Sequence, residues 1–371
     1  MKMTGIIFSN IYDTPMGALT KRRTVASMPF GGRYRFVDFA LSNMVNSRVS
    51  SIGVITKYNY ESLMEHLGGG SEWDLNRKDA NLYILPPFAT GATNVYRGNL
   101  EALSNAISFL DTTKPDYVVM CDTTVICNID FRKALKSHID SGADVTAICS
   151  RTIEDYECDS SDLVITAKDG TAKDLSIGYM IGTYPLIGMG MFIMERKELI
   201  KIIREFVGRG RYSFERDYLL PGFVSGSIKI NAYEFSGAVL RNHNVVSYFK
   251  NNFKLMDPEI NAQIFKRDAV IRTKVRDEAP SFYRKGSSVK KCLVADGCRI
   301  EGTVENSVLF RGVVVEKGAV VRNSIIMQGS RIEKNACVSF AIIDKNAHIS
   351  NSALLAGAPL SPLIINKDGR V

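Results

Sequence analysis

Basic residues gather at two nearby places in the N-terminal part of the chain. Lys21, Arg22 and Arg23 are consecutive, and Arg33 and Arg35 follow shortly after them. Guanidinium and ammonium groups close together can bind a small anionic ligand such as a sugar phosphate. The same residues can equally belong to a solvated surface, so the sequence leaves both interpretations open.

An acidic residue, Asp122, directly follows the apolar run that ends at Cys121, and an earlier apolar run ends at Phe8. Both runs are typical of buried strands. In a mainly parallel sheet, ligands bind at the carboxyl ends of the strands, so we expect any chemistry in the residues after Phe8 and Cys121. Asp122 could take part in that chemistry or be the cap of a helix or turn.

Short β-branched runs alternate with segments of helical period up to about residue 256, which predicts a mainly parallel sheet with helices on both faces. The predicted strands are Gly5–Phe8, Ile52–Thr56, Tyr117–Cys121, Val145–Cys149, Met189–Met194 and Ile228–Tyr233. Two helical faces are predicted, one with Phe36, Ala40, Met44 and Ser47 and one with Leu100, Leu103, Ile107 and Leu110. A turn at Asp169-Gly170 predicts a hairpin, so part of the later sheet is expected to be antiparallel.

A six-residue aliphatic period replaces the helical pattern after Gly286. Its members are Val308, Val314, Val320, Ile326, Ile332 and Val338, with Ile343 and Ile349 resuming it after a one-residue slip. Turn residues recur between them, for example at Gly329-Ser330 and Lys345-Asn346. This hexapeptide pattern predicts a parallel β-helix, in which each coil is stable only when stacked on the next.

The change of pattern predicts two domains and a connection. We expect an α/β domain over residues 1–256, a linker over 257–285 that contains Asp257-Pro258 and Ala279-Pro280, and a β-helix over 286–371.

Composition limits the classes of function. The chain has 371 residues, a net charge of +8 and a pI near 9.0, but most of its basic residues are dispersed, so we expect no nucleic-acid partner. Its seven cysteines form no CxxC pair and its four histidines are not spaced as metal ligands, so a zinc site is not expected. We find no apolar run of membrane-spanning length and expect a cytoplasmic protein that does not bind a membrane.

The stretch from Phe30 to Ser47, FGGRYRFVDFALSNMVNS, closely resembles the signature of bacterial glucose-1-phosphate adenylyltransferases, also called ADP-glucose pyrophosphorylases. Further matches are Gly53–Thr56, Tyr96–Gly98, Gly188–Gly190 and Asp217. The resemblance covers essentially the whole chain. It implies a nucleotidyltransferase-like, Rossmann-like domain with a mixed sheet, followed by a left-handed parallel β-helix of hexapeptide repeats.

The resembled enzymes join ATP and glucose 1-phosphate into ADP-glucose and pyrophosphate, with Mg²⁺ and ATP as family ligands. Such chemistry needs a glycine loop that cradles phosphates, cationic side chains and a metal. Here Ser9 and Asn10 replace two loop glycines, and Val25 stands where the family has a lysine. Phe88 replaces the glutamine that reads adenine in the family.

The metal site implied by the resemblance has two aspartates, and Asp122 matches the first. Arg241 occupies the position of the second, and a cation there would repel Mg²⁺. We therefore assign no catalytic residue, no metal site and no cofactor. Arg22, Arg23 and Arg35 match positions that contact a bisphosphate activator, although Pro29 replaces an associated histidine. These arginines could instead form salt bridges to carboxylates such as Asp38.

The resemblance therefore implies a non-catalytic, regulatory-type subunit that works in glycogen synthesis by assembling with a catalytic homologue. By analogy with the family, we expect a hetero-oligomer that is a tetramer. The sequence also leaves open an active nucleotidyltransferase with an atypical loop, and a scaffold subunit of a different complex. A hexapeptide acyltransferase is a further candidate, for which His348 is the available base in the repeats.

Overall fold

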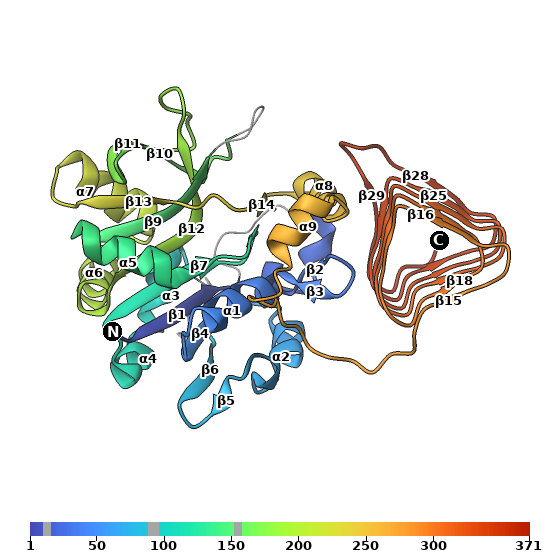
Figure 1. Ribbon diagram of the computed structural model, residues 1–371, viewed down its shortest axis with the longest axis horizontal. Coiled ribbons are helices and arrows are strands. Elements are labelled where there is room, and N and C mark those ends of the chain that lie inside the picture. Colours follow the sequence, from blue (N-terminus) through green and yellow to red (C-terminus); the bar gives the residue numbers. More distant parts are fainter. Residues whose placement is uncertain (10–15, 88–95, 152–157) are drawn as a thin grey trace. The chain divides into compact units, whose positions relative to one another are not determined.

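The computed structural model describes residues 1–9, 16–87, 96–151 and 158–371, which form two units (Figure 1). The sheet unit contains the described residues of three segments, 1–9, 37–239 and 266–272. The β-helix unit contains residues 16–36, 240–265 and 273–371. The second unit therefore combines the C-terminal coils with two segments that lie far before them in the sequence.

The sheet unit is built on one large mixed sheet with the strand order β10-β11-β13-β9-β12-β7-β1-β4-β6-β5. Its strands are β1 (Met3–Phe8), β4 (Ser51–Ile55), β5 (Asn76–Arg77), β6 (Ala80–Leu85), β7 (Tyr117–Asp122), β9 (Val145–Arg151), β10 (Leu163–Lys168), β11 (Thr171–Ile177), β12 (Leu186–Glu195) and β13 (Ile230–Glu234). Strands β7, β1, β4 and β6 are parallel, whereas β12 runs antiparallel to both β7 and β9. The six predicted strands are confirmed, with small shifts at their ends.

Helices cover both faces of this sheet, as predicted. On one face, α3 (Asn99–Ser104), α4 (Ile107–Thr113) and α6 (Arg196–Gly208) pack into a core with alternate residues of the strands, such as Ile6 and Val118. On the other face, α1 (Phe36–Asn46) packs Met44 against Gly5, and α5 (Phe131–Ser141) bonds β9 through His138 Nδ1 and Thr146 Oγ1 at 2.9 Å. The remaining short elements are α2 (Glu61–Leu67), η3 (Ser71–Trp73), β8 (Val125–Ile126), η4 (Phe214–Leu219) and α7 (Leu220–Val224).

Two local predictions for this unit have different outcomes. The hairpin at Asp169-Gly170 is confirmed, because β10 and β11 pair antiparallel on either side of it. The second apolar helical face is divided between α3 and α4, because the chain tightens at Asn105 into i to i+3 hydrogen bonds. Its leucines are nevertheless buried in the same core.

The C-terminal coils form a left-handed parallel β-helix whose three sheets are the sides of a triangular prism (Figure 1). The first sheet contains β15 (Phe282–Tyr283), β18 (Arg299–Ile300), β21 (Val314–Val315), β24 (Arg331–Ile332) and β27 (His348–Ile349). The second contains β16 (Ser288–Lys290), β19 (Thr303–Glu305), β22 (Val320–Arg322), β25 (Cys337–Ser339) and β28 (Leu354–Ala356). The third contains β17 (Leu293–Val294), β20 (Val308–Leu309), β23 (Ile325–Ile326), β26 (Ala341–Ile343) and β29 (Leu363–Ile365).

The β-helix core confirms the last five members of the predicted six-residue period, from Ile326 to Ile349, and corrects the first three by one residue, to Leu309, Val315 and Val321. Val315 and Val321 are fully buried in the core, whereas the predicted Val314 and Val320 are half-buried on the outer side of their strands. The central coils repeat every 17 residues, as the pairing of Val315 with Ile332 shows, so the spacing within a coil is six, six and five. The one-residue slip is therefore a regular feature of each coil rather than an interruption near the end.

The earlier segments of the β-helix unit contain short elements. These are η1 (Gly17–Thr20), η2 (Val25–Ser27), β2 (Pro29–Phe30), β3 (Tyr34–Arg35), β14 (Leu240–Arg241), α8 (Val245–Lys254) and α9 (Pro258–Ile264). Strands β2 and β3 form a hairpin whose turn has φ values of 60° and 83° at Gly31 and Gly32, a conformation that favours glycine. The buried Tyr248 hydroxyl donates to the carbonyl of Pro29 at 2.7 Å and ties α8 to this hairpin.

The predicted domain boundaries stay a prediction. Helix α9 lies within the predicted linker, and β15 joins the first coil before residue 286. Among the helices of the described ranges, none combines the length and apolar character that crossing a bilayer requires.

The phase of the β-helix core can be tested with two adjacent valines. We expect Val315→Ala to lower the free energy of unfolding by about 2 kcal/mol, because it removes buried methyl groups and leaves a cavity. Val314→Ala, the matched control on the outer side of β21, should cost less than about half as much. Urea unfolding followed by circular dichroism measures both, and equal losses would contradict the assigned orientation.

Candidate functional site

The strands that lead to the candidate nucleotide loop and to Asp122 end side by side. Phe8 at the end of β1 pairs with Asp122 at the end of β7, and the backbone N–H of Ser9 donates to the carbonyl of Ile55 at 3.1 Å. This confirms that the residues after Phe8 and Cys121 share the carboxyl edge of the sheet, where ligands bind in folds of this kind.

Ser9, the first predicted replacement of a loop glycine, is 1 % exposed, and its Oγ has no hydrogen-bond partner among the described residues. Glycine at this position would let the backbone approach a phosphate closely, because it has no side chain. Serine adds a side chain there. Asn10, the second replacement, and Phe88, at the adenine-reading position, lie outside the described residues.

The carboxylate of Asp122 has a local structural role. Its Oδ1 accepts a hydrogen bond from the backbone N–H of Thr124 at 3.0 Å, which is the turn cap that the sequence offered in place of a metal ligand. Gly190 lies against it with φ of 63°, and a Cβ there would be 3.0 Å from the Asp122 Cβ. Burial, followed by the proximity of Cys127 and Asp122, raises the pKa of the neighbouring Cys121 thiol.

The two remaining predicted replacements belong to the β-helix unit. Val25 lies in η2 and is 3 % exposed, so an uncharged, buried side chain occupies the position where the resemblance implies a lysine. Arg241 lies in β14, and its carbonyl accepts a hydrogen bond from Asn251 Nδ2 at 2.6 Å.

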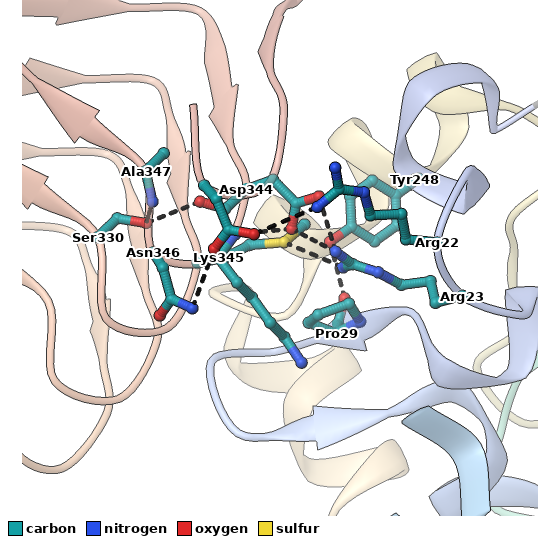
Figure 2. A network of polar contacts seen from close by, with 11 residues as sticks. Arg22, Arg23, Pro29, Tyr248, Ser330, Asp344, Lys345, Asn346 and Ala347 are labelled. Carbon is teal, nitrogen blue, oxygen red and sulfur yellow. Dashed lines mark hydrogen bonds and ion pairs between the residues drawn. The ribbon is translucent and has the colours of Figure 1, made fainter. Parts of the chain in front are cut away.

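Two of the three predicted effector residues form ion pairs within the β-helix unit. Arg23 is 3 % exposed, and its Nη2 lies 2.7 Å from both carboxylate oxygens of Asp344. Its Nη1 faces the sulfur of Met327 at 3.8 Å. Arg22 is exposed and lies 3.3 Å from Asp368 (Figure 2). Both arginines therefore form salt bridges, but with carboxylates other than Asp38. Asp38 instead contacts His66 Nε2 at 2.6 Å.

Lys345 adds a further cation beside this pair. Figure 2 shows its side chain leaving the coil next to Asp344. Burial, together with the positive charges of Arg35, Arg23 and Arg276, lowers the pKa of Lys345 to about 7, although the Asp344 carboxylate opposes that shift. Arg35, the third predicted effector residue, is itself buried in β3. Arg23, Arg35 and Lys345 thus concentrate positive charge in a partly desolvated region, which is suited to an anion.

Comparison with known proteins identifies the two regions of the chain. Residues 12–158 match the nucleotidyl transferase family model, and residues 278–357 match the model of the GlmU-like C-terminal hexapeptide. The glycogen biosynthesis protein GlgD of Bacillus subtilis is 34% identical over 318 residues, which cover 85% of this chain and 82% of the relative. GlgD of Geobacillus stearothermophilus is 36% identical, with 86% and 83% covered. The glucose-1-phosphate adenylyltransferase of Pseudothermotoga lettingae is 30% identical, with 86% and 76% covered.

The chain belongs to the glucose-1-phosphate adenylyltransferase family. The resemblance inferred from Phe30 to Ser47 is therefore confirmed, as is the architecture of a nucleotidyltransferase domain followed by hexapeptide repeats.

Two residues of this family member, Asp344 and Lys345, are not identified by the sequence patterns. The patterns place Lys345 only in a turn and do not single out Asp344. One signal could have identified them. Asp344 directly follows the buried run Ala341–Ile343, and a carboxylate that is buried with such a run requires a partner. The sequence does not show that the partner is Arg23, which lies 321 residues away.

The buried pair should contribute far more to stability than the exposed one. We expect Asp344→Asn to lower the free energy of unfolding by about 3–5 kcal/mol, because it leaves the Arg23 guanidinium buried without its countercharge. Asp368→Asn, the control at the exposed pair with Arg22, should cost less than about 1 kcal/mol. Chemical unfolding measures both changes, and a small loss for Asp344→Asn would contradict the buried pairing.

Lys345 should make stability depend on pH. Its pKa is about 7 in the folded chain and near its usual, higher value in the unfolded chain. Between these values the unfolded chain binds the extra proton, so the contribution of Lys345 rises with pH from about 7 toward 10. We expect the melting temperature of the wild type, relative to Lys345→Met, to increase between pH 6.5 and 9.5. A difference that is constant over this range would show that the lysine titrates normally.

Proposed function

We propose that this chain is a catalytically impaired, regulatory subunit of a glucose-1-phosphate adenylyltransferase that acts in glycogen biosynthesis by assembling with a catalytic homologue. The observation that carries the proposal is the buried, uncharged Val25 at the position where the family resemblance implies a lysine. Transfer of a nucleotidyl group develops negative charge that a cation must stabilise, and valine cannot supply one.

The residues around Asp122 also do not fit the Mg²⁺ that the family chemistry implies. Mg²⁺ binds hard oxygen ligands in near-octahedral geometry, usually with carboxylates in its first shell. One oxygen of Asp122 accepts the backbone N–H of Thr124, and the described residues contain no cluster of three His, Cys, Asp or Glu side chains that could hold a metal. We therefore derive no metal-dependent step for this chain.

The features that the chain keeps are those of a scaffold. The hairpin of β2 and β3, the helix that follows it and the stacked coils are all well packed, with Phe30 and Phe36 fully buried. Relatives of the GlgD type share 34–36% of the aligned residues over this scaffold. A folded chain with an altered active site can act on a partner if its interface favours one conformation of that partner.

A sugar phosphate effector is part of the same proposal. Arg23, Arg35 and Lys345 place three cationic groups in one partly buried region, and the lowered pKa of Lys345 reflects its burial and their mutual repulsion. A bound phosphoryl group would relieve that repulsion and raise the pKa of Lys345 again. The effector could then stabilise one state of the assembly, with Arg22 at its exposed edge.

Mixing experiments test the regulatory role. We expect the purified chain alone to form no ADP-glucose from ATP and glucose 1-phosphate. Added to a catalytic glucose-1-phosphate adenylyltransferase from the same source, it should change that enzyme's activity or effector response by a factor of about 5–150, the usual range of allosteric coupling.

Two outcomes would contradict this proposal. Turnover of about 1 per second or more by the chain alone would favour the active enzyme with an atypical loop. Unchanged kinetics and unchanged sedimentation after mixing would mean that the chain does not act on this partner. The exposed variant Arg322→Met, on the outer side of β22, is a suitable control for nonspecific effects of added protein.

A further inference from the structure

The first sheet of the β-helix has a hollow on its outer side. Strands β18, β21 and β24 place Arg299, Val314 and Arg331 next to one another there, because these residues pair in register along the parallel strands. Val314 is much shorter than the two arginines, so the row of long side chains is interrupted at β21. The cavity has a volume of about 580 Å³, which is within the range of sites for small molecules.

Charged side chains of both signs line this hollow in equal numbers. The three cationic and three anionic lining residues are Arg299, Arg331, Lys334, Glu301, Glu316 and Glu333. Glu301 accepts a hydrogen bond from Arg299 Nε at 3.3 Å, and Glu316 accepts one from Arg331 Nε at 2.8 Å. The lining is therefore neutral overall, and its field favours neither an anion nor a cation.

Glu316 offers a hydrogen-bond acceptor to this hollow. It follows Val314 by two residues on the same strand direction, so both side chains point to the outer side of the sheet. Its side chain is 14 % exposed, and both hydrogen bonds from Arg331 end on Oε1. Among the described residues no donor binds Oε2. A ligand hydroxyl in the hollow can therefore donate a charge-assisted hydrogen bond to that oxygen.

The mixture of donors and acceptors indicates the chemistry of the ligand. Guanidinium and ammonium groups only donate hydrogen bonds and carboxylates only accept them, whereas a hydroxyl does both. A ring with several hydroxyls can donate to Glu316 and accept from the exposed Lys334, while an apolar face of the ring lies on Val314. An uncharged sugar combines these properties without the net charge that the lining would have to balance.

An exposed aromatic ring continues the hollow along the sheet. Phe282 of β15 pairs with Arg299 of β18, so it lies one strand beyond the lining residues. Its exposed fraction is 55 %, and the Arg299 guanidinium lies 6.0 Å from its ring centroid. Such a ring offers a flat apolar surface on which a second sugar ring can pack. Neighbouring strands are about 4.8 Å apart, a spacing comparable with that of successive rings in a sugar chain.

We propose that the hollow over Val314 binds an uncharged sugar, with one hydroxyl donating to Glu316 Oε2 and, in a sugar chain, a second ring packed on Phe282. A second copy of this chain fits the same face less well, because a two-fold axis through the hollow would set one hollow against another. The site lies entirely on the β-helix and requires neither a catalytic partner nor an anionic effector. It is therefore independent of the regulatory function proposed above.

Titration calorimetry on the full chain tests the site, with maltotriose and glucose as the probes. We expect saturable binding of maltotriose that is insensitive to added sodium chloride, because the ligand is uncharged. Val314→Tyr fills the hollow and should weaken binding about tenfold or more. Val320→Tyr, the matched change on the outer side of the second sheet, should alter the affinity less than about twofold. Glu316→Gln keeps the side-chain volume and should also weaken binding, so the test does not depend on one variant.

The two probes distinguish a sugar chain from a free sugar. For a chain, Phe282→Ala should weaken maltotriose binding and leave glucose binding unchanged. For a free sugar, both probes should bind equally and Phe282→Ala should change neither affinity. The proposal is overturned if the wild type binds neither probe saturably, or if Val314→Tyr binds as tightly as the wild type. Self-association that Val314→Tyr abolishes and Val320→Tyr retains, without any sugar binding, would instead make this face a contact between copies of the chain.

Discussion

The ion pair between Arg23 and Asp344 is the constraint on which the β-helix unit depends. Both side chains are almost fully buried, and they join segments that are 321 residues apart in the sequence. Removing two charges from water costs several kcal/mol for each, so the pair is tolerable only when both members are in place. Residues 16–36 are therefore committed to the coil that carries Asp344, and the hairpin of β2 and β3 is held in the same unit.

The stretch that carries the family resemblance supplies packing to the same unit. Residues of the signature support packing, as the buried Phe30 and Phe36 show through their contacts with Tyr248. Burial raises the pKa of the Tyr248 phenol, so it remains a donor to the carbonyl of Pro29. Val25, at the position where the resemblance implies a lysine, is compatible with this packing, because a small aliphatic side chain fits a buried turn. Loss of Arg23 or Asp344 would leave an unpaired charge in the interior.

The sequence predicted the elements, but in the first coils of the β-helix it placed the core positions one residue too early. Strands such as β1 and β7 were identified because a buried strand has a continuous apolar run with clear ends. In the β-helix, Val314-Val315 and Val320-Val321 are pairs of equally apolar residues, so hydrophobicity alone did not show which valine faces the core. The corner geometry of a 17-residue coil decides it. For the candidate site, residue types predicted which positions carry a charged side chain. The roles of Asp344 and Lys345 could not be predicted, because the residues around them are distant in the sequence.

The β-helix unit buries several cationic side chains. Burying a charged side chain costs free energy at all times, whether the charge stabilises a transition state or binds a ligand in the ground state. Arg23, Lys345 and Arg311 all bear that cost, and a carboxylate compensates Arg23 directly, whereas burial lowers the pKa of both Lys345 and Arg311. In the described part of the β-helix unit, the Asp344 carboxylate therefore balances the charge of Arg23, and the buried, uncharged Val25 adds no further cation.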